Sequence, residues 1–544
     1  MTERSTVADD TSRGALSAPA GPDRADRMSP GSWRHTPRGR TPLVAGLVVA
    51  LSGIGLLVNG TVLAFRGLLV DDEGWYLQAA RAVAQGQLPY RDFAFTQGPL
   101  SPYVFAPGQA LSGGSLLAGR LTALVLVLLL FAVAVGSVWR AVGPPAAAAV
   151  GILLAADTGT TWALSMAKTY GIAALCLVAM SACLLDARHR DRSMAGATLL
   201  AGLAALDRFS AVTTWVVVGL GCLFLARSTR GRVLVALAGL VPVVGYGGLY
   251  LLAPTETRFG LWGYHQLTVE SGGLRALDGE LFVTRLPDVV ATYTIPLVLA
   301  CVAVAAAVST ADTRSMLRRR PGLVVAAAGT AAFMAGNFAA GEWHSDYLLP
   351  AVPATMMLSV VAVGLASASA APAPPSPTLP VAAVLVGAML VLLPGWGIGV
   401  DTFPSERTAL QRASDLAAPL EAVTGPDDTV LALHGAAVAV EAGRETVEGD
   451  SLGQFSYVDT PTENARRLDV LNAELLVALV RDAEPAAVLL SDWDRELLDR
   501  RGTVSTEPGD AGPFLAALEA NDVEVAVQSG FSQTGSELSL YVRR

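Results

Sequence analysis

The sequence predicts a mostly α-helical, polytopic membrane protein that ends in a small soluble α/β domain. Of its 544 residues, 52% are hydrophobic and only 16% are charged, and the mean hydropathy is +0.48. A composition this apolar is not typical of a soluble protein. The charge is uneven, since residues 401–544 carry a net charge of −15 and residues 1–400 carry +6. We therefore expect the two parts to face different surroundings.

The predicted bundle occupies residues 42–400. Residues 1–41 are rich in Arg, Ser, Pro, Gly and Asp and have no apolar periodicity, so we expect a disordered segment there. A helix that crosses a bilayer needs roughly 20 apolar residues, and about eleven such runs follow. The runs are residues 43–65, 116–138, 144–163, 169–186, 194–206, 210–226, 233–253, 289–309, 323–340, 348–369 and 379–400.

Arginine clusters predict the orientation of the bundle. They precede the first run and fill three later loops, at residues 34–40, 188–192, 227–232 and 314–320. All four fall on one side if the runs alternate across the bilayer, and the positive-inside rule makes that side the cytoplasm. We therefore expect a multi-pass protein of the plasma membrane with a cytoplasmic N-terminus. The loop at residues 66–115 and the tail at residues 401–544 would be extracytoplasmic.

The tail has the pattern of a soluble α/β domain. We expect helices at residues 405–423, 463–483 and 512–521, and strands at residues 429–434, 486–491, 523–528 and 537–543. Its acidic charge argues against nucleic acid as a partner, because phosphates would be repelled. It carries no nucleotide-binding or nucleophile-elbow motif. We expect it to fold by itself and to have no catalytic power of its own.

The first external loop carries the most informative motif. It reads Asp-Asp-Glu-Gly-Trp-Tyr over residues 71–76, Gly-Gln-Leu-Pro-Tyr-Arg-Asp over residues 86–92 and Gln-Gly-Pro-Leu over residues 97–100. Three adjacent carboxylates just beyond a membrane span suit a general base at the membrane surface. Sugar transfer to a hydroxyl needs such a base, together with a leaving group whose developing negative charge is stabilised. Polyprenyl phosphate is a leaving group of this kind.

A structural role for these carboxylates is the alternative. Asp71 or Asp72 would then cap a helix over residues 73–85 by accepting N–H bonds, and Gly86 would end that helix. The helix would carry an apolar stripe through Tyr76 and lie along the membrane surface.

Together these residues resemble the first periplasmic loop of the GT-C glycosyltransferases. They are most similar to the protein O-mannosyltransferase and lipid A aminoarabinose transferase group and its bacterial relatives that use polyprenyl-phosphate sugars. The shared features are an Asp-Glu pair, a following aromatic residue, a short helix, Gly-x-x-Pro-Tyr-x-Asp, and Gly-Pro-Leu before a span. The resemblance implies a GT-C-like bundle over residues 43–400 and Asp72 as the catalytic base, followed by Glu73. Asp71 is an extra carboxylate and stays a second candidate.

The resemblance also implies substrate contacts in the loop, at Tyr76, Tyr90, Asp92 and Gln97. Many relatives carry a lysine before the Gly-Pro step as a phosphate contact, where this chain has Gln97. Phosphate binding is therefore expected from other residues.

Two cations outside the loop are candidates for that contact. Lys168, the only lysine, and Arg208 lie at external ends of spans, where a charge near lipid is costly without a role. Snorkelling, or for Arg208 a local pair with Asp207, is the alternative. The segment at residues 341–350 resembles a late family motif in which an aromatic or basic loop is followed by Tyr-x-Leu-Pro. It adds His344 and Tyr347 as candidates.

These features predict an inverting membrane glycosyltransferase, a hexosyl- or pentosyltransferase. It would pass a sugar from a polyprenyl-phosphate donor to an extracytoplasmic glycan, lipid or protein, and the tail would help to hold the acceptor. The carboxylates with His344 or His265 suggest a divalent metal, although no ligand spacing supports one. A transporter or flippase for a lipid-linked glycan is the alternative, but no internal repeat accompanies it. A cell-wall binding module on a membrane scaffold is a third.

Overall fold

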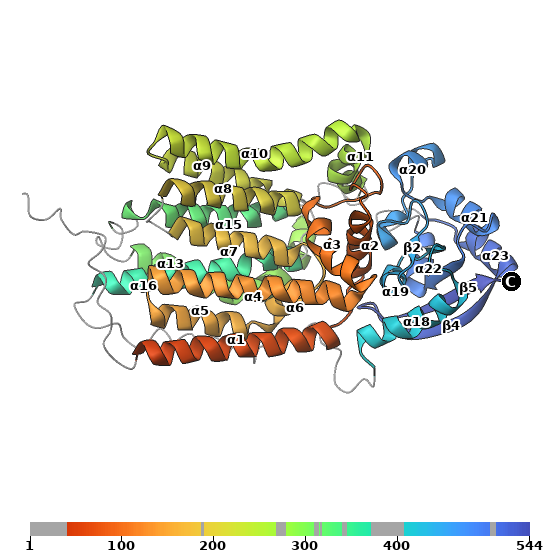
Figure 1. Ribbon diagram of the computed structural model, residues 1–544, viewed down its shortest axis with the longest axis horizontal. Coiled ribbons are helices and arrows are strands. Elements are labelled where there is room, and N and C mark those ends of the chain that lie inside the picture. The colour runs from red at the N-terminus through yellow and green to blue at the C-terminus, as the bar shows by residue number, and fades with distance from the viewer. Residues whose placement is uncertain are drawn as a thin grey trace, which may run out of the picture.

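The computed structural model describes residues 41–185, 190–267, 279–308, 315, 318–339, 345–370, 407–500 and 508–544. Residues 1–40, the expected span at 379–400 and His344 lie outside the described residues. The described chain forms a helical bundle with a five-stranded α/β tail at one end (Figure 1). This is the predicted architecture.

The bundle follows the predicted apolar runs. Its longer helices are α1 (Thr41–Arg66), α4 (Leu116–Ala141), α5 (Pro144–Ala156), α7 (Tyr170–Leu185), α8 (Arg190–Asp207), α9 (Val212–Leu225), α10 (Thr229–Leu252), α13 (Gly279–Val308), α15 (Pro321–Ala339) and α16 (Val352–Ala370). Shorter helical turns are α6 (Thr158–Leu164), η1 (Phe209–Ala211), α11 (Pro254–Arg258), η2 (Phe259–Gly263) and η4 (Ser345–Ala351). Among the described residues, five helices are long and apolar enough to cross a membrane, and a bent pair makes six. The protein is therefore polytopic.

The bent pair corrects one predicted span. The run at residues 144–163 is not one straight helix, because α5 and α6 meet at an angle of 72°. Asp157 lies at the bend, and its side chain accepts a hydrogen bond of 2.9 Å from the Thr160 N–H. A side chain that caps a new helix in this way competes with continuation of the previous helix. After the bend, α6 leads into residues 165–169 at the tail end of the bundle.

The first loop contains two helices, of which one was predicted. The helix α2 (Glu73–Ala84) lies across the end of the bundle, between the bundle and the tail (Figure 1). The helix α3 (Leu100–Ser112) was not predicted, because Pro107 inside it reads as a helix breaker. It ends at Gly113, whose φ of +73° is the left-handed conformation that favours glycine at a helix C-terminus.

The tail is a mixed sheet with the strand order β2-β1-β3-β5-β4. The strands are β1 (Thr429–Leu431), β2 (Glu445–Thr446), β3 (Ala487–Ser491), β4 (Asp522–Phe531) and β5 (Ser536–Arg543). The strand β1 pairs in parallel with β2 and β3, whereas β5 pairs antiparallel with β3 and β4. The helices are α18 (Ala409–Val423), α19 (Ala436–Glu441), η5 (Gly453–Ser456), α20 (Thr462–Leu468), α21 (Ala473–Arg481), α22 (Asp492–Leu498) and α23 (Gly512–Asn521).

One tail helix was predicted too long. The expected helix at 463–483 is two helices, α20 and α21. Asp469 between them has a φ of +53°, which no helix interior allows, and the Asn472 side chain caps α21 by accepting from the Leu475 N–H at 2.9 Å. The remaining predicted helices and strands of the tail are present, and the short elements α19, β2 and α22 were not foreseen.

The tail and the first loop share a hydrophobic cluster. Loop residues such as Trp75 and Phe95 are buried in it together with Leu452 and Val470 of the tail. An isolated tail would expose the apolar face that it buries here. Independent folding of the tail stays a prediction, and the apolar face that the tail shares with the loop argues against it.

Candidate active site

The beginning of α2 is anchored by a buried ion pair. Glu73 is fully buried, and its carboxylate accepts two hydrogen bonds from the guanidinium of Arg120 in α4, at 3.0 and 2.6 Å. The same guanidinium also donates to the backbone carbonyls of Gly67 at 2.9 Å and Leu68 at 3.1 Å. A buried pair with this many partners holds several segments together. Glu73 therefore fixes the end of α1, the beginning of α2 and α4 relative to one another.

Glu73 also holds the segment that carries the chain's only lysine. Its carboxylate accepts a hydrogen bond from the Ala167 N–H at 3.2 Å. The sequence neighbours of these two residues form an ion pair. Nζ of Lys168, which follows Ala167, lies 2.6 Å from Oδ2 of Asp72, which precedes Glu73. The bend between α5 and α6 is what leads this segment to α2.

Among the three adjacent carboxylates, Asp72 is the most accessible. Its side chain is 24% exposed, compared with 9% for Asp71 and 0% for Glu73. Asp72 occupies the N-cap position of α2, but its side chain makes no capping hydrogen bond. The capping alternative is therefore wrong for Asp72, and it does not apply to Asp71, whose carboxylate faces the tail.

Arg208 lies in the same buried polar cluster. It donates to Oγ1 of Thr169 at 2.9 Å and to Oδ1 of Asn337 at 3.3 Å. Its guanidinium lies 5.0 Å from the ring centroids of both Tyr170 and Tyr347. Stacking between two rings keeps the planar cation in one orientation.

The alternatives considered for the two cations do not fit this geometry. Arg208 is 7% exposed and Lys168 5% exposed, so neither side chain extends toward the bilayer surface as a snorkelling residue would. Arg208 bonds to Thr169 and Asn337 rather than to its neighbour Asp207. No described residue accepts a hydrogen bond from its Nε. That nitrogen is buried and has an unused hydrogen-bond donor.

A second carboxylate, Asp346, completes the surroundings of the lysine. It accepts a hydrogen bond of 2.6 Å from the Tyr170 hydroxyl, and the Lys168 ammonium lies 4.8 Å from the same ring. Burial by itself would lower the pKa of Lys168, but the charges of Asp72 and Asp346 outweigh it and raise that pKa. Lys168 is therefore a fixed positive charge between two carboxylates. Asp346 was not among the predicted site residues, although it directly precedes Tyr347.

Tyr76 is the predicted loop residue that joins this cluster. It is buried and stacks on Trp75, with ring centroids 3.9 Å apart. Burial, and then the charge of Asp72, raise the pKa of its hydroxyl well above the ordinary value. Tyr76 is therefore a neutral hydroxyl beside the charged pair of Asp72 and Lys168.

The other predicted loop residues lie away from the pair. The Tyr90 hydroxyl donates to the backbone carbonyl of Gln97, and Tyr90 itself has a φ of +66°. Asp92 pairs with Arg91 at 2.7 Å and accepts from the Leu88 N–H at 2.8 Å. These contacts shape the loop.

Gly98, which follows Gln97, packs against the end of α8, directly before Arg208 in the chain. A Cβ on Gly98 would lie 2.2 Å from the Leu206 carbonyl oxygen and 2.6 Å from the carbonyl carbon of Asp207, so only glycine fits there.

Within the described ranges, no three side chains of His, Cys, Asp and Glu gather in a way that could hold a metal ion. The metal that the sequence suggested involved His344, which lies outside these ranges, or His265, which lies within them.

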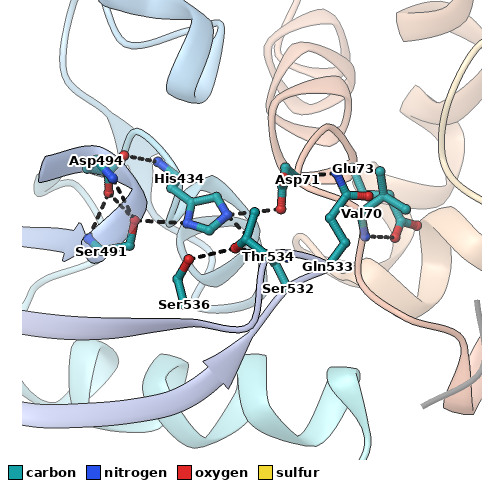
Figure 2. A network of polar contacts seen from close by, with 10 residues as sticks. All are labelled: Val70, Asp71, Glu73, His434, Ser491, Asp494, Ser532, Gln533, Thr534 and Ser536. Carbon is teal, nitrogen blue, oxygen red and sulfur yellow. Dashed lines mark hydrogen bonds and ion pairs between the residues drawn. The ribbon is translucent and has the colours of Figure 1, made fainter. Parts of the chain in front are cut away.

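The tail contributes one buried residue that sequence reasoning missed. Nε2 of His434 lies 2.9 Å from Oδ1 of Asp71, next to the accessible Asp72 (Figure 2). The two residues are 363 positions apart, and no motif surrounds His434 in the sequence.

Comparison with known proteins supports the fold. No protein-family model matches the sequence, and no curated protein matches it. The chain is similar to ArnT from Cupriavidus metallidurans, bound to undecaprenyl phosphate and in the apo state. Each has a TM-score of 0.55 and 16% identity, and the match covers 92% of this chain and 98% of that protein.

A second similarity is to the archaeal oligosaccharyltransferase AglB from Archaeoglobus fulgidus, in complex with an inhibitory peptide and a dolichol-phosphate. Its TM-score is 0.45 at 13% identity, over 92% of this chain and 74% of that protein. The likeness to ArnT shows that the two chains share a fold, and this fold is the polytopic helical bundle with a C-terminal domain that the sequence predicts.

Proposed function

We propose that this protein is an inverting membrane glycosyltransferase that takes a sugar from a polyprenyl-phosphate donor and transfers it to an extracytoplasmic hydroxyl. The observation that carries the proposal is the pair of Asp72 and Lys168, 2.6 Å apart, in a buried polar cluster at one end of a GT-C bundle. The undecaprenyl phosphate bound to ArnT supports a lipid-linked donor here.

Asp72 is the general base of this mechanism. It is the accessible carboxylate of the three, and an acceptor hydroxyl that reaches it loses its proton to Asp72 as the hydroxyl oxygen attacks the anomeric carbon. The new bond joins the acceptor oxygen to that carbon, and the bond from the carbon to the phosphate oxygen breaks. Attack from the face opposite the leaving phosphate inverts the anomeric configuration.

Lys168 and Arg208 stabilise the leaving phosphate. The electron pair of the broken bond stays on the phosphate oxygen, so negative charge grows there in the transition state. Lys168 is held in its charged form, and Nε of Arg208 has no acceptor among the described residues. Arg208 stands in for the lysine that many relatives have where this chain has Gln97. Tyr76 and Tyr347 border the same space and are candidates for contacts with the sugar.

The orientation follows from the arginine clusters. By the positive-inside rule, the N-terminus is cytoplasmic, and the tail with the carboxylate cluster is extracytoplasmic at the plasma membrane. The tail, which packs on α2, is placed to hold the acceptor.

The transporter alternative has one point of contact with the structure, the broken span α5–α6. That break leads Ala167 and Lys168 to the carboxylates at the bundle end. A substrate site for transport belongs near the middle of the bilayer. The position of the charged cluster therefore favours the enzyme.

The test offers membranes that contain the protein a panel of radiolabelled undecaprenyl-phosphate sugars. Wild-type protein should move label from one of these donors to a membrane or envelope acceptor, and the Asp72→Asn membranes should not. Absence of transfer by wild-type protein from every donor would contradict the proposal.

A further inference from the structure

The neighbour of the proposed base is held from the tail. Asp71 lies in the turn before α2, and its two carboxylate oxygens have different tail partners. Oδ1 lies 2.9 Å from Nε2 of His434, and Oδ2 accepts from the Gln533 side-chain amide at 3.0 Å (Figure 2). Both donors come from segments more than 300 residues away in the sequence. The turn at residues 70–73, which carries the proposed base, is thus held by His434 and Gln533 of the tail, and we call these two contacts the clamp.

His434 is itself fixed within the tail. Its Nδ1 lies 2.9 Å from Oγ of Ser491, and its backbone N–H donates to Oδ1 of Asp494 at 3.1 Å. The ring packs edge-to-face on Phe531, with centroids 5.6 Å apart, and Oγ of Ser532 lies 3.0 Å from Nε2. The side chain is fully buried. A ring with these contacts has no freedom to follow Asp71, so Asp71 must follow the ring.

Counting hydrogens assigns the ring's charge. Ser491 has one hydroxyl hydrogen, which goes to the Asp494 carboxylate at 2.8 Å, so its oxygen can only accept from Nδ1 of His434. Asp71 is also an acceptor, so Nε2 must donate as well. Both ring nitrogens carry hydrogen, and His434 is an imidazolium that faces a carboxylate on the catalytic turn.

We propose that His434, with Gln533, is a positioning residue of the tail that acts through Asp71 to place Asp72 for proton abstraction. The inference rests on the proposed function, because it assigns the base to Asp72. The bundle holds the Glu73 side of this turn through Arg120 and meets the Asp72 side chain through Lys168, whereas the tail holds the Asp71 side. Docking of the tail on the bundle therefore also brings Asp72 into position.

The matched variants of His434 separate its two nitrogens. A Gln side chain places its N–H near Nε2 and keeps the bond to Asp71, whereas Asn places its N–H near Nδ1 and keeps only the bond to Ser491. With a donor from which wild-type protein transfers sugar, we expect His434→Asn to lower kcat by about 100-fold, the scale of a misplaced catalytic group. The KM for the donor should stay within about threefold, and His434→Gln should recover most of kcat. Equal kcat in His434→Asn and wild type would overturn the proposal.

Gln533 gives a variant that should fold in any case, because its hydrogen bond to Asp71 is exposed. Gln533→Ala should lower kcat by about threefold to tenfold at unchanged melting temperature, the scale of one ordinary hydrogen bond, because this bond is exposed to solvent. Unchanged kcat would count against the clamp even if His434→Asn failed to fold.

A measurement without sugar transfer keeps the two proposals apart. Hydrogen exchange of the full-length protein in detergent should be faster at the amides of Val70, Glu73 and Tyr76 in His434→Asn than in wild type or His434→Gln. These amides bond within the turn. Unchanged exchange would overturn the positioning role whatever the activity. Faster exchange without wild-type transfer from any donor would leave the clamp standing and reject the proposed function.

Discussion

At the scale of single residues, three neighbouring carboxylates have three different environments. Glu73 is enclosed by Arg120 and backbone N–H groups, Asp71 faces the tail, and Asp72 meets Lys168 with about a quarter of its side chain exposed. Burial and full hydrogen bonding make a carboxylate a structural anchor. Partial exposure beside a fixed cation makes one available to substrate. The sequence alone cannot make this distinction, because all three residue types suit both roles.

Replacement of Asp72 by Asn tests the base. Asn keeps the shape of the side chain and removes the basic carboxylate. We therefore expect normal amounts of folded protein and a decrease in kcat of about 100-fold or more. The measurement is transfer of labelled sugar at saturating donor. Near-normal turnover in Asp72→Asn with a collapse in Asp71→Asn would move the base to Asp71.

Glu73→Gln is the control for this series and should fail differently. It leaves the buried Arg120 guanidinium without its counter-ion, which costs about 3–5 kcal/mol. The expected result is less folded protein and a lower melting temperature.

Lys168 should bind the phosphate of donor and product. Its loss in Lys168→Gln removes a charge-assisted hydrogen bond, so inhibition by free undecaprenyl phosphate should weaken by about 10-fold to 100-fold. Lys168→Arg keeps the charge and should stay within about tenfold of wild type. An unchanged inhibition constant in Lys168→Gln would remove this residue from the phosphate site.

Sequence reasoning reached the residues that stand out chemically. Asp72 belongs to a motif, and Lys168 and Arg208 are conspicuous because charge is costly at membrane depth. It missed Asp346 and His434, whose roles come from contacts across more than 170 positions of the chain. No local pattern contains such contacts.

At the scale of elements, apolar length and periodicity predicted the helices, and capping side chains decided where they break. The bend at Asp157 interrupts a run that is apolar on both sides, and the break at Asp469, where φ is +53°, interrupts a helical pattern. Consequently the sequence predicted where the apolar helices of the described bundle lie better than it predicted their shape. The bend matters for function, because it positions Lys168.

The contact between α2 and α19 depends on one glycine. A Cβ on Gly74 would lie 2.4 Å from the backbone nitrogen of Ala437, and backbone cannot move aside as a side chain can. Gly74→Ala should therefore destabilise tail docking by about 1–3 kcal/mol, the cost of overpacking. Melting temperature and protease release of the tail measure it.

Gly136 in α4 is the matched control, since a Cβ there meets nothing within 4 Å. Gly136→Ala should be neutral or stabilising by up to about 1 kcal/mol. Equal melting temperatures of the two variants would contradict the close packing of α2 on α19.

Docking of the tail should depend on pH through the link between His434 and Asp71. Burial alone would lower the pKa of His434, but the hydrogen bond to Asp71 and the charge of Asp494 raise it above 6.5. A raised pKa stabilises docking fully below 6.5, and this contribution is lost as pH rises through the folded value. For Asp71, burial alone would raise the pKa, but the bond to His434 lowers it below 3.8, so its contribution is lost only in strong acid.

The expected result is that protease resistance of the tail in the full-length protein falls as pH rises above neutrality. The charged groups near the ring are Asp71 and Asp494, while the β4–β5 hairpin adds only hydroxyls and the Gln533 amide. His434→Gln cannot titrate, so its tail should show no such fall. The same fall in both proteins would assign the effect to another group.

At the scale of the whole molecule, the two ends of the helical bundle differ in their charged residues: the carboxylate cluster lies at one end and arginines lie at the other. The helix α7 begins at Tyr170 in the polar cluster, and α8 ends directly before Arg208, so the other ends of the two helices, at Leu185 and Arg190, lie at the far end of the bundle. Asn337 near the end of α15 also contacts Arg208, which puts the arginines at 318–320 at that far end. The tail and the carboxylates therefore lie opposite the arginines, as alternating spans require.

This arrangement predicts that the arginine end is cytoplasmic and the tail extracytoplasmic. Alkaline phosphatase, which is active only outside the cytoplasm, should be active when fused after Arg544 and inactive when fused after Ser228, between α9 and α10. The two sites lie at opposite ends of the same bundle, so each controls for expression of the other. A cytoplasmic reporter active at Arg544 would reverse the orientation. The carboxylates would then face the cytoplasm, and an extracytoplasmic acceptor could not reach Asp72.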